Sequence, residues 1–115
     1  MDAKQTVTAL GALAQESRLA VFRLLVQQGP GGLPAGAIGE HVGIPPTTLS
    51  FHLAQLSHAG LVLSQRKGRS IVYAANYAGM QDLIGFLLDN CCQAAGCGPR
   101  RKPARPRAIK KQDRN

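Results

Sequence analysis

The chain has 115 residues, of which 44% are apolar, and it contains no Trp, three Phe and two Tyr residues. This length provides one small core of aliphatic side chains, which argues against several domains and makes further burial by homodimerisation an expectation. The net charge is +8, but eight of the fourteen Lys and Arg residues lie in residues 100–114, and residues 1–99 carry six bases against five acids. A charge that suggests an anionic polymer as partner is therefore concentrated outside the predicted folded part.

The chain shows no signal for export or membrane insertion. No apolar run approaches the about 18 residues that a membrane-spanning helix needs, and the N-terminus MDAKQTVTAL lacks the regions of a secretory signal. All three cysteines lie in residues 91–97, and an odd number argues against a disulfide-stapled secreted protein. We expect a cytoplasmic protein with no membrane partner.

Apolar spacings of three and four predict two helices in the first part of the chain. The first helix, in residues 4–14, has an apolar stripe made of Val7, Leu10, Leu13 and Ala14. The second, ESRLAVFRLLVQQG, has a stripe made of Leu19, Phe22, Leu25 and Val26, and Gly29 with Pro30 ends it. A loop, GPGG, follows.

Two further helices are predicted next. Residues 34–42 form helices weakly because of two glycines, but Pro34 suits a first helical position. The segment IPPTTLSFHLAQLSHAG, residues 44–60, places Pro46 where a helix tolerates proline and ends at Gly60. The inward side chains of this second helix are Leu49, Leu53 and Leu56.

The apolar period changes after Gly60. Alternating residues on either side of the polar turn 66–69 predict a β-hairpin, with Leu61 and Leu63 before the turn and Ile71 and Tyr73 after it. Helical spacing returns after Asn76, through Met80, Leu83, Ile84, Leu87, Leu88 and Cys91. We assign residues 1–97 to one domain that ends in the cysteine cluster 91–97, and residues 98–115 to a disordered, basic, proline-containing tail.

This order predicts a mostly α winged helix-turn-helix with a β-hairpin wing. The second helix of the motif, which opens with Pro46 and closes at Gly60, can enter the DNA major groove. The predicted outward face of that helix consists of Thr47, Ser50, Phe51, Ala54 and His58. Hydroxyl groups can bond base edges or phosphates, and Phe51 can touch a thymine methyl group. The alternative is that these side chains only cover a small domain, with Phe51 an incidental surface aromatic.

The candidate DNA contacts also include Thr48, His52 and the basic residues of the hairpin tip. The full set is Thr47, Thr48, Ser50, Phe51, His52, Ala54, Arg66, Lys67 and Arg69. His52 lies near the core side of its helix, so a structural hydrogen-bonding role is favoured over base reading. The three bases around Gly68 favour phosphate contacts over a merely solvated tip.

Three blocks carry a family resemblance: LAQESRLAVFRLLVQQG, IGEHVGIPPTTLSFHLAQLSHAGLV and RKGRSIVYAAN. They resemble the ArsR/SmtB family of metal-responsive repressors over about residues 7–90. The resemblance implies a homodimer packed through its first and last helices, binding to an imperfect inverted repeat in double-stranded operator DNA, and release by an inducer. The corresponding dimer contacts are Val7, Leu10, Leu13, Met80, Leu83, Ile84 and Leu87.

Members of this family differ in their metal ligands. The segment before the predicted recognition helix, residues 39–43, has no Cys-x-Cys pair, and no His follows His58 to complete a zinc site with Asp82 and Asp89. The remaining candidates, Cys91, Cys92 and Cys97, resemble the C-terminal cluster of an arsenite-sensing branch. Soft thiolates favour a soft centre such as As(III), or Sb(III), which takes three sulfur ligands.

Other interpretations of the thiols stay open. Cys91 can be a small core residue with the others incidental, or the thiols can serve redox or persulfide sensing in a regulator or a protein-docking module. Structural zinc lacks a fourth ligand in the cluster. An enzyme is not expected, because no cysteine is followed by the phosphate-binding loop of an arsenate reductase. The basic tail is either a nonspecific DNA anchor or a solvated tail, and the latter is preferred.

Overall fold

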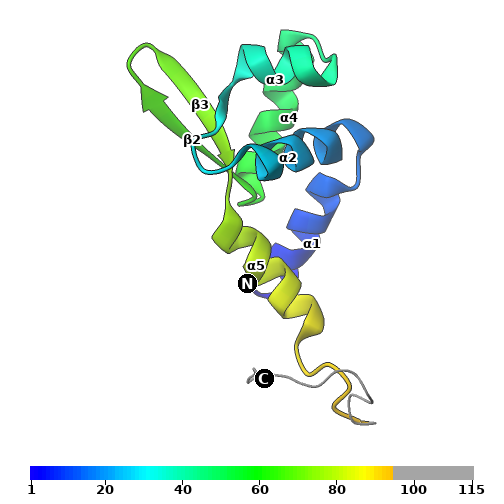
Figure 1. Cartoon of the computed structure of the whole chain (residues 1–115). Coiled ribbons are helices and arrows are strands. Elements are labelled where there is room, and N and C mark those ends of the chain that lie inside the picture. The colour runs from blue at the N-terminus through cyan, green and yellow to red at the C-terminus, as the bar shows by residue number, and fades with distance from the viewer. Residues whose placement is uncertain (95–115) are drawn as a thin grey trace.

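The computed structural model describes residues 1–94, so Cys97 and the predicted tail lie outside the described residues. Residues 1–94 form five helices and three strands. In chain order they are α1 (Ala3–Leu13), α2 (Glu16–Gln28), β1 (Leu33–Pro34), α3 (Ala35–Val42), α4 (Pro46–His58), β2 (Val62–Lys67), β3 (Ser70–Ala75) and α5 (Tyr77–Leu88). The hairpin of β2 and β3 projects from the part built by α2, α3 and α4, whereas α1 and α5 lie together at the other end (Figure 1). The predicted winged helix-turn-helix is confirmed.

The helix-turn-helix is formed by α3 and α4, and glycine and proline set its boundaries. Gly43 ends α3 in the left-handed conformation, and Pro46 occupies the first turn of α4, where its missing N–H leaves no hydrogen bond unmade. Pro34, in contrast, was predicted as the first helical residue and precedes α3 as its cap. Its backbone is extended because it also belongs to β1.

The sheet has the order β1-β3-β2 and is antiparallel throughout. The predicted hairpin is confirmed, with Val62 opposite Ala75 and Lys67 opposite Ser70. The strand β1 was not predicted, because two residues are too few to show an alternating pattern. Gly32 permits its pairing: a Cβ at this position would lie 2.5 Å from the carbonyl oxygen of Tyr73.

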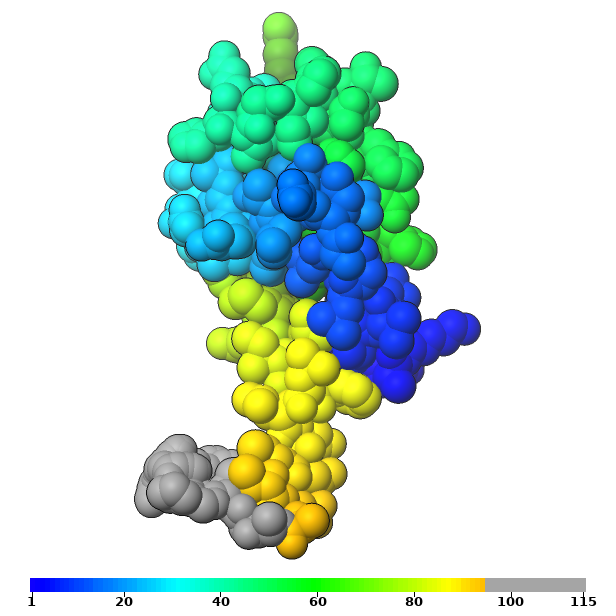
Figure 2. Space-filling model, turned by 90° about the vertical axis from the view of Figure 1, so that its right-hand side faces the viewer, coloured from blue at the N-terminus to red at the C-terminus, as the bar shows by residue number. Residues whose placement is uncertain are grey.

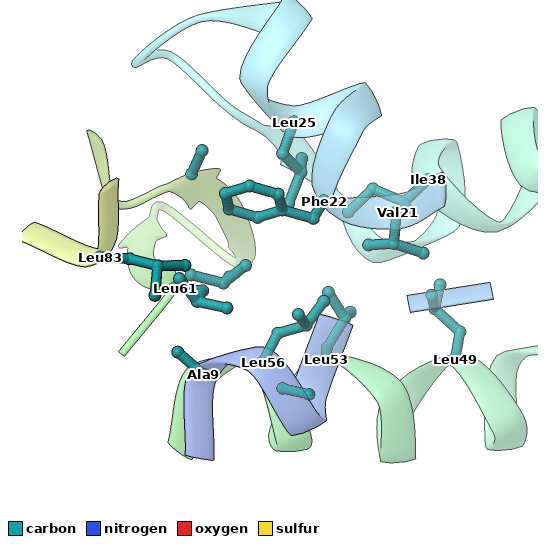
Figure 3. Packing of buried hydrophobic residues seen from close by; sticks show 13 residues of the cluster. Ala9, Val21, Phe22, Leu25, Ile38, Leu49, Leu53, Leu56, Leu61 and Leu83 are labelled. Atoms are coloured by element: carbon teal, nitrogen blue, oxygen red, sulfur yellow. The ribbon is translucent and has the colours of Figure 1, made fainter. Parts of the chain in front are cut away.

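The core lies between the five helices and the base of the hairpin (Figure 3). The predicted inward residues Leu49, Leu53 and Leu56 are all buried in it. Burying a side chain of this size stabilises the fold by about 1.5–3 kcal/mol relative to leaving it exposed. The core therefore fixes which side of α4 faces outward.

Several predicted apolar positions face solvent instead. On α2, Leu19 is exposed and Val21 is buried, so the stripe is rotated from the predicted one. On the hairpin, Leu63 is exposed, because Val62 supplies the inward side chain and side chains alternate along a strand. Leu19 and Leu63 belong to the predicted apolar patterns, but they are not part of the buried core.

The last helix is shorter than predicted, and its first turn is capped by a side chain. It ends at Leu88, because Asp89 adopts an extended backbone, so Cys91 does not continue its stripe. Asn76 caps its first turn by accepting from the Gly79 N–H at 3.1 Å. Within residues 1–94, no helix combines the length and apolar character that crossing a bilayer requires.

Candidate DNA-reading face and thiol pair

The outer side of α4 carries small polar side chains and one aromatic ring. We call its exposed residues the DNA-reading face: Thr47, Thr48, Ser50, Phe51 and Ala54. Phe51 is 58% exposed, and its ring lies edge-on to that of His52 with centroids 5.9 Å apart. The predicted exposure of Thr47, Ser50, Phe51, Ala54 and His58 is confirmed, whereas contact of α4 with DNA stays a prediction. Holding a large apolar ring in water costs free energy unless a partner covers it.

His52 faces the protein interior. It is 7% exposed, and its Nδ1 lies 3.3 Å from Nη1 of Arg18. Burial, together with the neighbouring guanidinium of Arg18, lowers the pKa of His52 below its ordinary value. The structure therefore favours the structural role for His52, and its place among candidate DNA contacts does not fit this geometry.

The hairpin tip gathers positive charge. Arg66, Lys67 and Arg69 are all exposed, and they account for three of the six bases in residues 1–99. Within residues 1–94, no carboxylate forms an ion pair with them. A tip with this composition can donate to phosphate oxygens beside a groove that α4 occupies.

The helices α1 and α5 lie side by side in both views (Figures 1 and 2), and both carry exposed apolar side chains. We call this surface the α1–α5 apolar face: Val7, Leu10, Ile84, Leu87 and Leu88. Val7 is 69% exposed although it begins the predicted stripe, because Ala9 and Ala12 supply the contacts of α1 with its own core. An uncovered apolar surface of this kind is typical of an interaction site.

Not every predicted dimer contact lies on that face. Leu83 is 5% exposed and belongs to the core of its own subunit, near Ala9 and Leu61 (Figure 3). Met80 and Leu13 are half-buried against the same core. The structure thus assigns Leu83 to the packing within one chain.

Two of the three predicted metal ligands are close together. Cys91 and Cys92 follow α5 in a turn, where Asn90 and Cys92 have left-handed backbones with φ of 62° and 60°. The two Sγ atoms lie 3.5 Å apart, and both residues are exposed. We call them the thiol pair. In the part of the chain that the structure describes, no three His, Cys, Asp or Glu side chains gather as a metal site, and the third predicted ligand, Cys97, lies outside that part.

The described segment that follows α5 and contains the thiol pair lies at the end opposite α3 (Figures 1 and 2). A joint at the start of α5 connects this helix to the rest. Asn76 donates from Nδ2 to the Gly60 carbonyl at 2.9 Å, and the Tyr77 hydroxyl donates to the Val26 carbonyl at 2.9 Å. Asn76 could have been recognised as a helix cap from its position, but the contact of Tyr77 with α2 has no sequence signal.

Comparisons with known proteins agree with this architecture. A family described as a helix-turn-helix domain matches residues 13–65. A homodimeric winged helix-turn-helix DNA-binding domain from Mycobacterium bovis, described as a possible ArsR-family transcriptional regulator, is 30% identical, with a TM-score of 0.60. That match covers 76% of this chain and 81% of that structure. The chain belongs to the ArsR family of winged helix-turn-helix regulators.

Two further relatives fit this ArsR-family assignment. An ArsR-like transcriptional regulator from Rhodococcus sp. RHA1 has a TM-score of 0.66 at 25% identity, over 73% of this chain and 76% of that one. The HTH-type transcriptional regulator NmtR of Mycobacterium tuberculosis is 40% identical over 72 residues, which are 63% of this chain. The aligned part spans 58% of NmtR, less than two thirds of that relative. The matched residues 13–65 contain α2 to most of β2, so the thiol pair lies outside the family match.

Proposed function

We propose that this protein is a homodimeric transcriptional repressor that binds operator DNA and is released when As(III), or Sb(III), is captured by Cys91, Cys92 and Cys97. The observation that carries the proposal is the 3.5 Å separation of two thiol sulfurs at the end of a helix that belongs to the α1–α5 apolar face. Ligand capture and subunit packing would therefore share one helix.

The DNA-reading face and the hairpin tip support DNA binding. Hydroxyls on α4 can bond base edges, and Phe51 can pack against a thymine methyl group in the major groove. Arg66, Lys67 and Arg69 would bind the adjacent phosphates and add the salt-dependent part of the affinity. Two copies of α4 in a symmetric dimer would read two half-sites of an imperfect inverted repeat.

The α1–α5 apolar face supports the dimer. A second copy would cover the same five side chains by two-fold symmetry, which is the commonest arrangement of soluble homo-oligomers. Removing these side chains from water would contribute about 25 cal/mol for each Å² of apolar surface buried.

The chemistry of the thiol pair supports a thiophilic inducer. A zinc–sulfur bond is about 2.3 Å long, and two sulfurs bonded to one atom at this length lie at most about 4.6 Å apart. The 3.5 Å distance between the Sγ atoms of Cys91 and Cys92 falls within this limit. Arsenite would exchange its three hydroxyl groups for three thiol sulfurs and release three water molecules. Cys97 would supply the third sulfur, since it follows Cys92 by five residues with Gly96 between them.

Capture would act on DNA through the last helix. A third sulfur bound to the thiol pair would reshape the turn after Leu88, beside the exposed Leu87 of the apolar face. Arsenite would then stabilise a dimer in which the two recognition helices no longer match successive major grooves. A typical coupling of about 1–3 kcal/mol corresponds to about a 5- to 150-fold loss of operator affinity.

A gel-shift titration tests the proposal on a duplex that the wild-type chain selects from a random library. We expect sodium arsenite to release the wild-type protein and to leave the Cys91→Ser, Cys92→Ser, Cys97→Ser triple variant bound. Zinc chloride serves as the control ligand and should release neither protein, because the cluster has no fourth ligand. Equal release of both proteins by arsenite would refute the sensing role.

The same sulfur distance favours a second candidate, redox sensing. Adjacent thiols can pass two electrons and two protons to a peroxide, forming a disulfide and water. Mass spectrometry after hydrogen peroxide treatment would then show a Cys91–Cys92 disulfide, and DNA release would follow peroxide rather than arsenite.

A further inference from the structure

Arg18 joins three helices, and neither the DNA-reading face nor the thiol pair includes it. It lies in the first turns of α2 and is half-buried. Its Nε donates to the carbonyl oxygen of Ala12 in the last turn of α1 at 2.7 Å, and its Nη1 donates to Nδ1 of His52 on α4 at 3.3 Å. The guanidinium thus bridges a helix of the α1–α5 apolar face to the helix of the DNA-reading face.

The hydrogen bond from Arg18 determines which ring nitrogen of His52 carries the proton. An Arg side chain can only donate, so Nδ1 of His52 accepts and the ring proton resides on Nε2. At the other end, the last carbonyls of a helix carry partial negative charge, which the guanidinium of Arg18 stabilises at the end of α1. The planar guanidinium provides both donors from fixed positions, which the single ammonium group of Lys cannot reproduce.

The bridge also reaches the exposed surface of the recognition helix. The His52 ring lies against that of Phe51, with centroids 5.9 Å apart and an interplanar angle of 61°. A chain of contacts therefore runs from Ala12 through Arg18 and His52 to Phe51. On α1, Val7 and Leu10 are exposed on the side away from the buried Ala9 and Ala12.

We propose that Arg18 is a positioning residue that fixes the orientation of α4 relative to α1 and so couples the packing of two subunits to the reading of operator DNA. This inference rests on the proposed DNA-binding function. The hydrogen bonds of Arg18 would connect the subunit interface to the recognition helix through α1. This connection is separate from the hydrogen bonds of Asn76 and Tyr77 at the start of α5.

The test compares Arg18→Lys with Arg23→Lys. Both substitutions lie on α2 and keep the charge, but Arg23 is exposed and makes no hydrogen bond or ion pair within residues 1–94. On the duplex selected by the wild-type chain, we expect Arg18→Lys to lower affinity by about 5- to 150-fold and Arg23→Lys to leave it unchanged. Circular dichroism and sedimentation should show that both variants are folded and dimeric. Full affinity in Arg18→Lys, or an equal loss in both variants, would overturn the proposal.

A conservative change at the other end of the bridge distinguishes positioning from general stability. His52→Asn keeps an acceptor near the place of Nδ1 and should retain operator affinity, whereas His52→Leu, which keeps the bulk but removes the acceptor, should lose it as Arg18→Lys does. Equal affinities of the two His52 variants would contradict the bridge.

Nitrogen NMR of the DNA-free wild-type protein provides a readout that does not depend on the proposed function. We expect the His52 proton on Nε2 at neutral pH, and a rise of the His52 pKa in Arg18→Met but not in Arg23→Met. A proton on Nδ1 would exclude the bridge. If the wild-type chain binds no duplex, the proposed function fails, and the tautomer of His52 still decides whether Arg18 connects the two helices.

Discussion

Single residues decide how the interior of this protein responds to acid, and His52 is the clearest case. Among residues 1–94, it is the titratable side chain buried in the core, and the charged group that acts on it is Arg18. A proton added to its ring would remove the acceptor for Arg18 and place two positive charges side by side. The fold therefore favours the neutral imidazole.

The lowered pKa of His52 predicts a loss of stability in acid. The unfolded chain binds the proton near pH 6.5, its ordinary pKa, and the folded chain binds it only at lower pH. The stabilisation is complete above about pH 6.5 and is lost as pH falls through the lower folded pKa. We expect the melting temperature to fall more steeply between pH 7 and pH 5 for the wild type than for His52→Asn. Parallel slopes for the two proteins would show that His52 does not contribute.

At the scale of elements, the start of α5 is packed too tightly for any side chain at Gly79. A Cβ there would lie 2.5 Å from the carbonyl oxygen of Gly60, whereas Gly85, six residues later on the same helix, has no atom within 4 Å of an added Cβ. The same substitution should therefore have opposite effects at the two positions.

We expect Gly79→Ala to destabilise the protein by about 1–3 kcal/mol, as overpacked sites do. Gly85→Ala should stabilise it by up to about 1 kcal/mol, because Ala is the better helix former. Urea unfolding monitored by circular dichroism measures both. If Gly79→Ala unfolds at the wild-type midpoint or above it, the backbone contact at the joint is not as close as described.

Element positions were predicted well wherever a long apolar pattern existed. The spacing of Leu49, Leu53 and Leu56 placed α4 and its outward face correctly, because a helix with one buried side repeats every three or four residues. Periodicity did not predict elements that are very short, or a helix end that is set by a change in backbone conformation. The two residues of β1 are too few to form a pattern, and an apolar stripe continues past Leu88 although Asp89 ends the helix.

Of the candidate sites, only the types of side chain and their exposure could be predicted. The sequence places Cys91 beside Cys92, but the approach of their sulfurs depends on the left-handed backbones at Asn90 and Cys92. The link between Arg18 and His52 joins positions 34 residues apart and follows from how α2 packs on α4. Such contacts depend on tertiary packing, which no local pattern encodes.

For the whole molecule, the α1–α5 apolar face predicts the state of association. We expect Leu87→Asp to convert the dimer into monomers, because a carboxylate buried without a partner at an apolar interface costs several kcal/mol. Leu63→Asp is the matched control, since both leucines are 55% exposed but Leu63 lies on the hairpin. Analytical ultracentrifugation should show monomers for Leu87→Asp alone. A dimeric Leu87→Asp protein would place the subunit interface elsewhere.

The thiol pair belongs to neighbouring residues of one chain, so each subunit carries its own copy. A symmetric dimer would then contain two thiol pairs, one in each subunit, at which arsenite could bind. Under the proposed capture of arsenite, saturation would require two equivalents of arsenic per dimer, and binding at one thiol pair alone would yield a half-loaded species. The steepness of gene induction would then depend on whether that species still holds the promoter.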